Sequence, residues 1–192
     1  MLRITAGEHR GRKLPVPEVR ATRPLVERAR QAVMDHLREL LPGAVVWDVY
    51  AGSGILGFEA LSRGAGEVLA VERHPKAARQ LAASARLLGY EDRVRVLQRD
   101  ARAFLAAETG APDLVFFDPP YADFRGPGRE AVWALFCALA GRLAPGGAAV
   151  VHTPKGILSD AERGLLPGIE RRDYGSTSIY WWHAPPDGDE PA

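Results

Sequence analysis

The sequence predicts an α/β fold: a doubly wound, mostly parallel, seven-stranded sheet with helices on both faces and a small N-terminal hairpin and helix appendage. Short, nearly continuous apolar runs alternate with longer helical patterns, as in a parallel sheet that is covered on both faces. Turns rich in Gly and Pro separate these segments. The 192 residues suffice for one domain with a sizeable core.

The individual elements follow from these patterns in chain order. Residues 2–5 and 13–16 predict a hairpin, and apolar residues at helical spacing from Leu25 to Leu40 predict a helix that Pro24 begins and Pro42-Gly43 ends. Strands are expected near 45–49, 67–72, 94–98, 113–118 and 147–152, helices near 54–63, 75–88, 100–107 and 128–142, and a closing antiparallel hairpin over 169–174 and 176–182. We divide the chain into a basic arm with its helix (1–43), an α/β domain (44–183) and a disordered acidic tail (184–192).

Composition narrows the class of protein. The first residues lack the apolar core of a signal peptide, and the longest uncharged apolar stretch, 131–141, is too short to span a bilayer. We therefore expect a cytoplasmic protein with no membrane partner, acting as a monomer. The single cysteine, Cys137, lies in an apolar run typical of the core. No Cys/His cluster has zinc spacing, so no metal site is expected, and none of the five scattered histidines is assigned a catalytic role.

The most informative segment is Asp118-Pro119-Pro120-Tyr121, directly after the apolar run 114–117. It places a carboxylate, two residues without a backbone N–H and an aromatic ring at the carboxyl end of a strand, where open α/β sheets bind ligands. The carboxylate of Asp118 and a proline carbonyl together can accept both hydrogens of a planar –NH2 group, and Tyr121 can stack on its ring. A loop that merely turns after the strand remains the alternative, because Asp-Pro often begins turns.

A second motif lies between the predicted strand 45–49 and the helix after it. Gly52, Gly54 and Gly57 form the pattern G-x-G-x-x-G, and Glu72 follows about 20 residues later. Taken alone, this pattern predicts a nicotinamide dinucleotide. Asp48 argues against that interpretation, because a nearby carboxylate opposes a pyrophosphate at the helix N-terminus. The same carboxylate attracts the sulfonium and ammonium of S-adenosylmethionine (SAM).

Three acids at successive strand ends fit a cationic adenosyl ligand. Glu72 is expected to accept both ribose hydroxyls, and Asp100 to meet the adenine amine. Taken singly, each acid is also compatible with capping the next helix. This arrangement resembles the Rossmann-like fold of the class I SAM-dependent methyltransferases. The candidate cofactor-binding residues are Asp48, Tyr50, Gly52, Ser53, Gly54, Glu72, Arg73, Asp100 and Ala101.

Charge is concentrated at the N-terminus although the net charge is only +1. Residues 1–30 carry eight Lys and Arg residues against three Glu residues, which favours a polyanion partner. An Arg-rich composition is the alternative, since 22 of the 25 basic residues are Arg. The candidate RNA-binding residues are Arg10, Arg12, Lys13, Arg23, Arg28 and Arg30. We expect this arm to bind RNA and to leave the cofactor site alone.

These motifs together resemble a known family. The family is that of the bacterial 16S rRNA (guanine-966-N2) methyltransferases, the ribosomal small-subunit methyltransferase D family. Its motif I is similar to the stretch from Asp48 to Ala65, which begins Asp48-Val-Tyr-Ala-Gly-Ser-Gly-Ile-Leu-Gly. Residues 3–14 resemble that family's N-terminal signature, and 118–121 its catalytic motif. The resemblance covers about residues 2–183. The segment 25–31 departs from it, lacking a usual Thr and having Gln31 where Glu is usual.

The resemblance implies that SAM binds at Asp48, Gly52, Gly54, Glu72 and Asp100. It also implies that residues 118–121 hold a guanine flipped out of 16S rRNA, in the small subunit or its assembly intermediate. Asp118 and the Pro119 carbonyl would accept the hydrogens of guanine N2, and Tyr121 with Phe124 would stack on the base. Two other functions stay open: methylation of another exocyclic amine, such as adenine N6 in DNA, and a SAM-binding module without catalysis.

Overall fold

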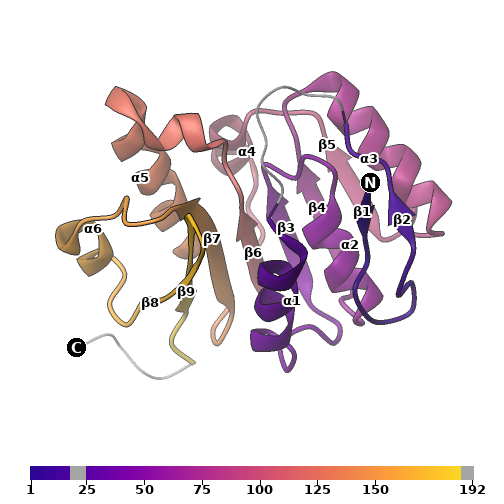
Figure 1. The fold of residues 1–192 in the computed structure, drawn as a ribbon, viewed down its shortest axis with the longest axis horizontal. Helices are drawn as coiled ribbons and strands as arrows, with labels where there is room; N and C mark the ends of the chain where they lie inside the picture. Colours follow the sequence, from indigo (N-terminus) through magenta and orange to yellow (C-terminus); the bar gives the residue numbers. More distant parts are fainter. Residues whose placement is uncertain (18–24, 187–192) are drawn as a thin grey trace.

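The computed structural model describes residues 1–17 and 25–186. Its centre is a seven-stranded sheet in the order β5-β4-β3-β6-β7-β9-β8 (Figure 1). The strands are β3 (Val45–Val49), β4 (Glu67–Val71), β5 (Val94–Leu97), β6 (Leu114–Phe117), β7 (Ala148–Pro154), β8 (Glu170–Tyr174) and β9 (Thr177–His183). The first five run parallel, and β9 is antiparallel to both β7 and β8. The predicted sheet and its closing hairpin are confirmed.

Helices cover both faces of this sheet. The helices α1 (Glu27–His36), α2 (Ile55–Ser62) and α3 (Pro75–Leu87) share one apolar core with the sheet, and α4 (Ala101–Ala107) and α5 (Arg129–Ala140) share the other. The start predicted for the first helix at Pro24 lies outside the described residues. The short α6 (Asp160–Gly164) and the 3-10 turns Tyr121–Phe124 and Gly126–Gly128 were not predicted. A capping box between Ser159 and Glu162 starts α6, but no apolar periodicity marks it.

The N-terminal hairpin packs onto the α/β domain. Its strands β1 (Leu2–Arg3) and β2 (Lys13–Leu14) pair antiparallel. Ile4 and Leu14 are fully buried in the same cluster as Val33 of α1 and Val46 of β3. The hairpin and α1 therefore contribute to the core beside the sheet. Within the described part of the chain, no helix has the length and apolarity to cross a membrane.

Sheet register brings the predicted site residues to one edge. Val49 pairs with Val71 on one side and with Phe117 on the other, so the residues that follow β3, β4 and β6 come out side by side. The connections run outward in opposite directions from β3 and β6, which makes this the switch point where open α/β sheets bind ligands. On the far side of β6, Phe117 pairs with Val151, which sets His152 level with Asp118.

Candidate active site

The loop after β3 is held in a conformation that side chains disfavour. Tyr50, Gly52 and Gly54 have φ of 63°, 55° and 75°, in the left-handed region that glycine adopts at low cost. A Cβ atom on Gly54 would lie 2.7 Å from Cε2 of Phe58 and 2.9 Å from Cγ of Leu81. Only glycine therefore fits at this position, where the loop enters α2.

Glu72 clamps this loop from the end of the neighbouring strand. Its Oε2 accepts a hydrogen bond from the Gly52 N–H at 2.9 Å, and its Oε1 accepts one from the His74 N–H at 2.7 Å. Each carboxylate oxygen has a second lone pair, so the side chain can still accept from a ligand hydroxyl. Glu72 therefore lies beside the glycine loop, and its contact with the ribose hydroxyls stays a prediction.

Asp48 is a buried acid below the same loop. Its Oδ2 accepts a hydrogen bond from the Gly57 N–H at 3.0 Å. Burial, reinforced by repulsion from Asp118 and Glu72, raises the pKa of Asp48 to about 8, against the lowering effect of that hydrogen bond. The carboxyl is therefore mostly neutral at pH 7 in the protein alone. A cationic ligand would stabilise the ionised form of Asp48. The attraction between Asp48 and SAM that the sequence suggested therefore requires Asp48 to lose its proton when the ligand binds.

The other cofactor candidates are only partly brought together. Asp48, Tyr50, Gly52 and Ser53 line a cleft that Asp118 closes at its other end. Asp100 is exposed and caps α4, accepting from the Arg102 N–H at 2.9 Å, which is the capping role its sequence position also allowed. Arg73 is exposed, Ala101 is buried, and neither lines the cleft.

One wall of this cleft comes from the N-terminal arm. Val16, Pro17 and Leu25 face Gly52 and Asp118 across it. The expectation that the arm leaves the cofactor site alone is therefore wrong. The chemistry of the cleft fits SAM: the buried acid Asp48 and the glycine loop line it, and Glu72 holds that loop from outside the lining. The volume of this cleft is about 30 Å³.

The Asp118–Tyr121 motif borders a second, larger cleft. This cavity of about 750 Å³ is lined by Leu25, Val26, Arg28, Tyr121, His152 and the β8–β9 turn from Asp173 to Thr177. Asp118 lines the first cleft and Tyr121 the second. The motif therefore lies between the two clefts and contributes a side chain to each.

The structure adds a residue that we did not predict. His152, buried on β7, lies with Nδ1 2.7 Å from Oδ1 of Asp118 and with Nε2 2.9 Å from the hydroxyl of Tyr121. That hydroxyl is also 2.5 Å from Oγ1 of Thr177. The signal was present in the sequence, because His152 follows an apolar run at a strand end, as Asp118 does. From the sequence we assigned none of the histidines a catalytic role, and the structure places His152 in contact with this motif.

Phe124 is placed differently from the prediction. Its side chain is fully buried in the core that α5 forms with the sheet. The backbone of Pro120 accepts from the Asp123 N–H and turns the chain into a 3-10 helix, which directs Phe124 inward. Stacking of Phe124 on a base is therefore excluded. Tyr121, half-buried on the larger cleft, keeps its predicted position.

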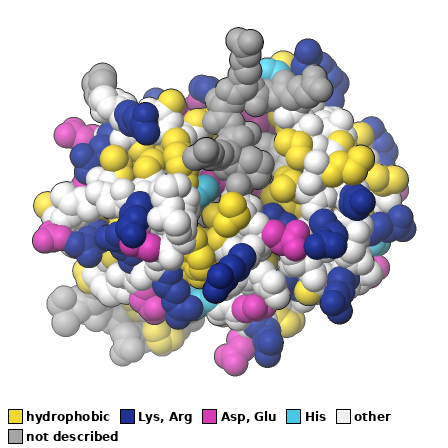
Figure 2. All heavy atoms as spheres, viewed as in Figure 1, with side chains coloured by type: hydrophobic (Ala, Val, Ile, Leu, Met, Phe, Trp, Pro, Cys, Tyr) yellow, Lys and Arg dark blue, Asp and Glu magenta, His cyan; other side chains and the backbone are white. Residues whose placement is uncertain are grey.

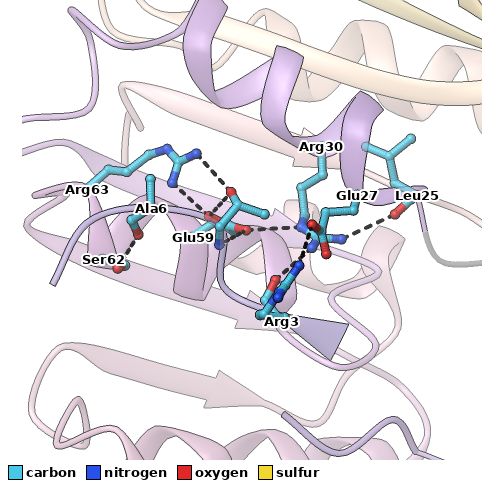
Figure 3. Close-up of polar contacts among 9 residues, drawn as sticks. Arg3, Ala6, Leu25, Glu27, Arg30, Glu59, Ser62 and Arg63 are labelled. Atoms are coloured by element: carbon cyan, nitrogen blue, oxygen red, sulfur yellow. Dashed lines mark hydrogen bonds and ion pairs between the residues drawn. The ribbon is translucent and has the colours of Figure 1, made fainter. Parts of the chain in front are cut away.

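Arg30 is not available for RNA. Its side chain is 1% exposed and donates to Oε1 of Glu59 at 3.1 Å and to the carbonyls of Leu25 and Arg3 (Figure 3). Glu59 also accepts from Arg63 at 2.8 Å. The prediction of Arg30 as an RNA-binding residue is wrong. It is a structural residue that ties α1 to α2 and to the hairpin.

The remaining basic candidates are exposed. Arg10, Arg12 and Lys13 lie in and beside the β1–β2 turn, and Arg28 lies on the rim of the larger cleft. Arg23 lies outside the described residues. On the face shown in Figure 2, Lys and Arg side chains are interspersed with Asp and Glu side chains instead of forming one continuous patch. Any nucleic-acid contact on this face therefore depends on local groups of arginines.

The fold and the strand-end site define the class I SAM-dependent methyltransferases, and SAM, the cofactor expected from the sequence, is the cofactor of this class. A SAM-dependent O-methyltransferase of Thermotoga maritima shares the fold, with a TM-score of 0.68 at 16% identity over 88% of this chain and 69% of its own. The chain belongs to the family described as Conserved hypothetical protein 95, whose model matches residues 2–183.

Relatives with a named function indicate which kind of methyltransferase the chain is similar to. The chain is 38% identical over 120 residues to Ribosomal RNA small subunit methyltransferase D of Escherichia coli K12, covering 62% of this chain and 60% of that protein. A Haemophilus influenzae protein of the same name is 37% identical over 62% of this chain and 64% of its own length. The structure of a hypothetical protein of Thermus thermophilus matches with a TM-score of 0.78 at 33% identity, over 96% of this chain and 99% of that one. The resemblance to the methyltransferase D family is confirmed.

Proposed function

We propose that this protein transfers a methyl group from SAM to the exocyclic N2 of a guanine in 16S rRNA, in the small ribosomal subunit or its assembly intermediate, acting in the cytoplasm as a monomer. The observation that carries the proposal is the position of Asp118–Tyr121 between the two clefts. One cleft has the glycine loop and buried acid that suit SAM, and the other has the volume for a flipped nucleoside.

The names of the relatives support an rRNA of the small subunit as substrate. The matches cover about 60% of those proteins' lengths, so activity and substrate are proposed for this chain. The exposed Arg10, Arg12 and Lys13 would contact phosphates beside the target, and Arg28 the backbone of the flipped nucleotide itself. The candidate cofactor contacts are Asp48, the Gly52–Gly54 loop and Glu72, and Asp100 and Arg73 are candidates at the periphery of the cofactor site.

The chain's own residues would act by orientation. Guanine N2 is a weak nucleophile because its lone pair is delocalised into the ring. Asp118 and the Pro119 carbonyl would accept the two N–H groups and favour a pyramidal nitrogen, and Tyr121 would hold the ring. SAM, when bound, supplies a methyl group on a sulfonium: the N2 lone pair forms the new N–C bond, the S–C pair stays on sulfur, and the surplus proton leaves the nitrogen. The carboxylate of Asp118 would receive that proton.

The test is nucleoside analysis by mass spectrometry. The protein is incubated with SAM and, in separate reactions, with unmethylated 16S rRNA, small subunits from a strain that lacks this modification, and duplex DNA. We expect N2-methylguanosine from an RNA-containing substrate only. N6-methyldeoxyadenosine from DNA would instead establish the amine-methyltransferase alternative, and no methylated nucleoside with intact SAM binding would establish a binding module.

A further inference from the structure

We propose that His152 is a positioning residue that holds both polar ends of the Asp118–Tyr121 motif at once. The inference deepens the proposed function and rests on it for its kinetic part. Each ring nitrogen of His152 faces one member of the motif: Nδ1 lies 2.7 Å from Oδ1 of Asp118, and Nε2 lies 2.9 Å from the hydroxyl of Tyr121. The ring itself is 5% exposed, so water does not compete for these bonds.

The hydrogen-bond partners determine which nitrogen of His152 donates and which accepts. A carboxylate only accepts, so Nδ1 of His152 carries the proton and donates it to Asp118. In the neutral ring, Nε2 is then an acceptor, and the Tyr121 hydroxyl donates to it. The Tyr121 oxygen accepts in turn from the hydroxyl of Thr177, 2.5 Å away. Nε2 also lies 3.4 Å from Oγ1 of Thr177, so a longer alternative has Thr177 donating to Nε2 and Tyr121 donating to Thr177. Nε2 is the acceptor in both arrangements.

This arrangement has a consequence for each end of the motif. With Oδ1 of Asp118 held by His152, Oδ2 is the oxygen that can turn toward the target amine. With the Tyr121 hydroxyl held between His152 and Thr177, the phenol ring is fixed on the wall of the larger cleft. Thr177 begins β9, and His152 pairs with Ile179 of the same strand, so the chain of bonds is anchored in the sheet. A rigid support of this kind limits misplacement of a catalytic group, which can cost on the order of 100-fold in rate.

Two amide substitutions separate the two ring nitrogens. His152→Asn puts an amide N–H near the position of Nδ1 and loses the contact to Tyr121. His152→Gln puts its amide near the position of Nε2 and loses the donor to Asp118. We expect His152→Gln to lower kcat by roughly 10- to 100-fold, with the KM for RNA and the Kd for S-adenosylhomocysteine nearly unchanged. His152→Asn should lose less of kcat than His152→Gln does, because it keeps the donor to Asp118. His183→Gln, the same change at the exposed far end of β9, is the matched control.

A double variant tests whether His152 acts through Asp118. In an Asp118→Ala background, His152→Gln should cause no further loss of kcat, because the group that it orients is gone. Multiplicative losses would overturn the proposal, as would a His152→Gln variant with the kcat of the wild type, or a loss confined to KM.

A measurement on the wild-type protein is independent of activity and of variant folding. Long-range ¹H–¹⁵N NMR of the histidine rings, with His152 assigned from the signals missing in His152→Asn, should show a protonated Nδ1 and an unprotonated Nε2. The opposite tautomer would overturn the proposal. If the protonated Nδ1 is found while no nucleoside is methylated, the proposed function fails and the positioning of Asp118 by His152 stands.

Discussion

The buried Arg30–Glu59 pair yields a prediction whose magnitude can be worked from its contacts (Figure 3). Both side chains are at most 1% exposed. The two oxygens of Glu59 accept from the backbone and hydroxyl of Thr5, from Arg30 and from Arg63, at 2.8–3.1 Å. Removing Glu59 leaves the buried charge of Arg30 uncompensated. Removing Arg30 leaves Glu59 with only the partly exposed Arg63 as ionic partner and leaves two carbonyls without a donor, and each loss costs about 3–5 kcal/mol. Glu59→Gln and Arg30→Met should therefore each destabilise the protein by that amount.

The double variant should cost much less than the sum of the two. With the charges of Arg30 and Glu59 gone, the remaining Arg63 charge is partly exposed to water. The main penalty is then that the carbonyls of Leu25 and Arg3 lose their donor, at about 1–3 kcal/mol each. The loss is then about 2–6 kcal/mol, against about 6–10 kcal/mol if the single effects added. The coupling between the two sites is the difference, roughly 4 kcal/mol.

Guanidinium unfolding followed by tryptophan fluorescence measures these values, since Trp47, Trp133 and Trp181 are buried. Glu27→Gln is the matched control: its pair with Arg3 lies in the same cluster, but both side chains are about half exposed, so it should change stability by at most ~1 kcal/mol. Single effects that add to within about 0.5 kcal/mol in the double variant would refute the reasoning.

Three further predictions concern the site. Asp118→Ala should lower kcat by roughly 100-fold or more with little change in S-adenosylhomocysteine affinity by calorimetry; near-normal turnover would remove Asp118 from the mechanism. Glu72→Ala should weaken the affinity for S-adenosylhomocysteine by about 1–3 kcal/mol, because the Gly52 and His74 N–H groups lose their acceptor and the loop is no longer held. Tight NADH binding by the wild type would show that the dinucleotide interpretation was right. Replacing Arg10, Arg12 and Lys13 with Ala should flatten a plot of log RNA affinity against log salt by about 2 if each contacts a phosphate, and an unchanged slope would leave composition bias as the explanation of the arm's charge.

The sequence was sufficient for the sheet and for most strand-end residues. Continuous apolar runs identify buried parallel strands, and the carboxyl ends of those strands must meet at one edge, so the patterns alone predict that Asp48, Glu72 and Asp118 lie together. The glycine loop was likewise visible from its spacing. These features depend on local periodicity and on a single rule of topology.

The residues whose roles were not predicted correctly depend on partners that lie far away in the sequence. Arg30 meets Glu59 across 29 residues and His152 meets Asp118 across 34, and a one-dimensional pattern does not reveal such partners. A weaker signal existed for Arg30, which follows Ala29 and precedes Val33 and Met34 on the buried stripe of α1. A basic residue on an apolar stripe needs a buried acid, and Glu59 is that acid.

The pKa of Asp48 yields the last prediction, on the pH dependence of cofactor binding. Burial raises the pKa of Asp48 to about 8 in the protein alone. A bound sulfonium and ammonium favour the ionised carboxylate and so lower this pKa, and binding then releases a proton. Below about pH 8 the protein must give up that proton to bind, so affinity for the cation rises with pH. Above about pH 8 the carboxyl is already ionised, and this contribution levels off.

Between about pH 6 and pH 8 the Kd for SAM should fall by about 50-fold if the pKa in the complex is below about 6, since each pH unit below the pKa of the free protein changes the affinity about tenfold. Calorimetry in buffers of different ionisation enthalpy should show close to one proton released at about pH 7. Asp48→Asn keeps an acceptor for the Gly57 N–H but cannot titrate, so its pH profile should contain only the titration of the ligand's own amine. Identical profiles for the wild type and Asp48→Asn would mean that Asp48 does not ionise on binding. Its carboxyl would then serve the Gly57 hydrogen bond alone, and the electrostatic case for a cationic cofactor would rest on Glu72 and Asp118.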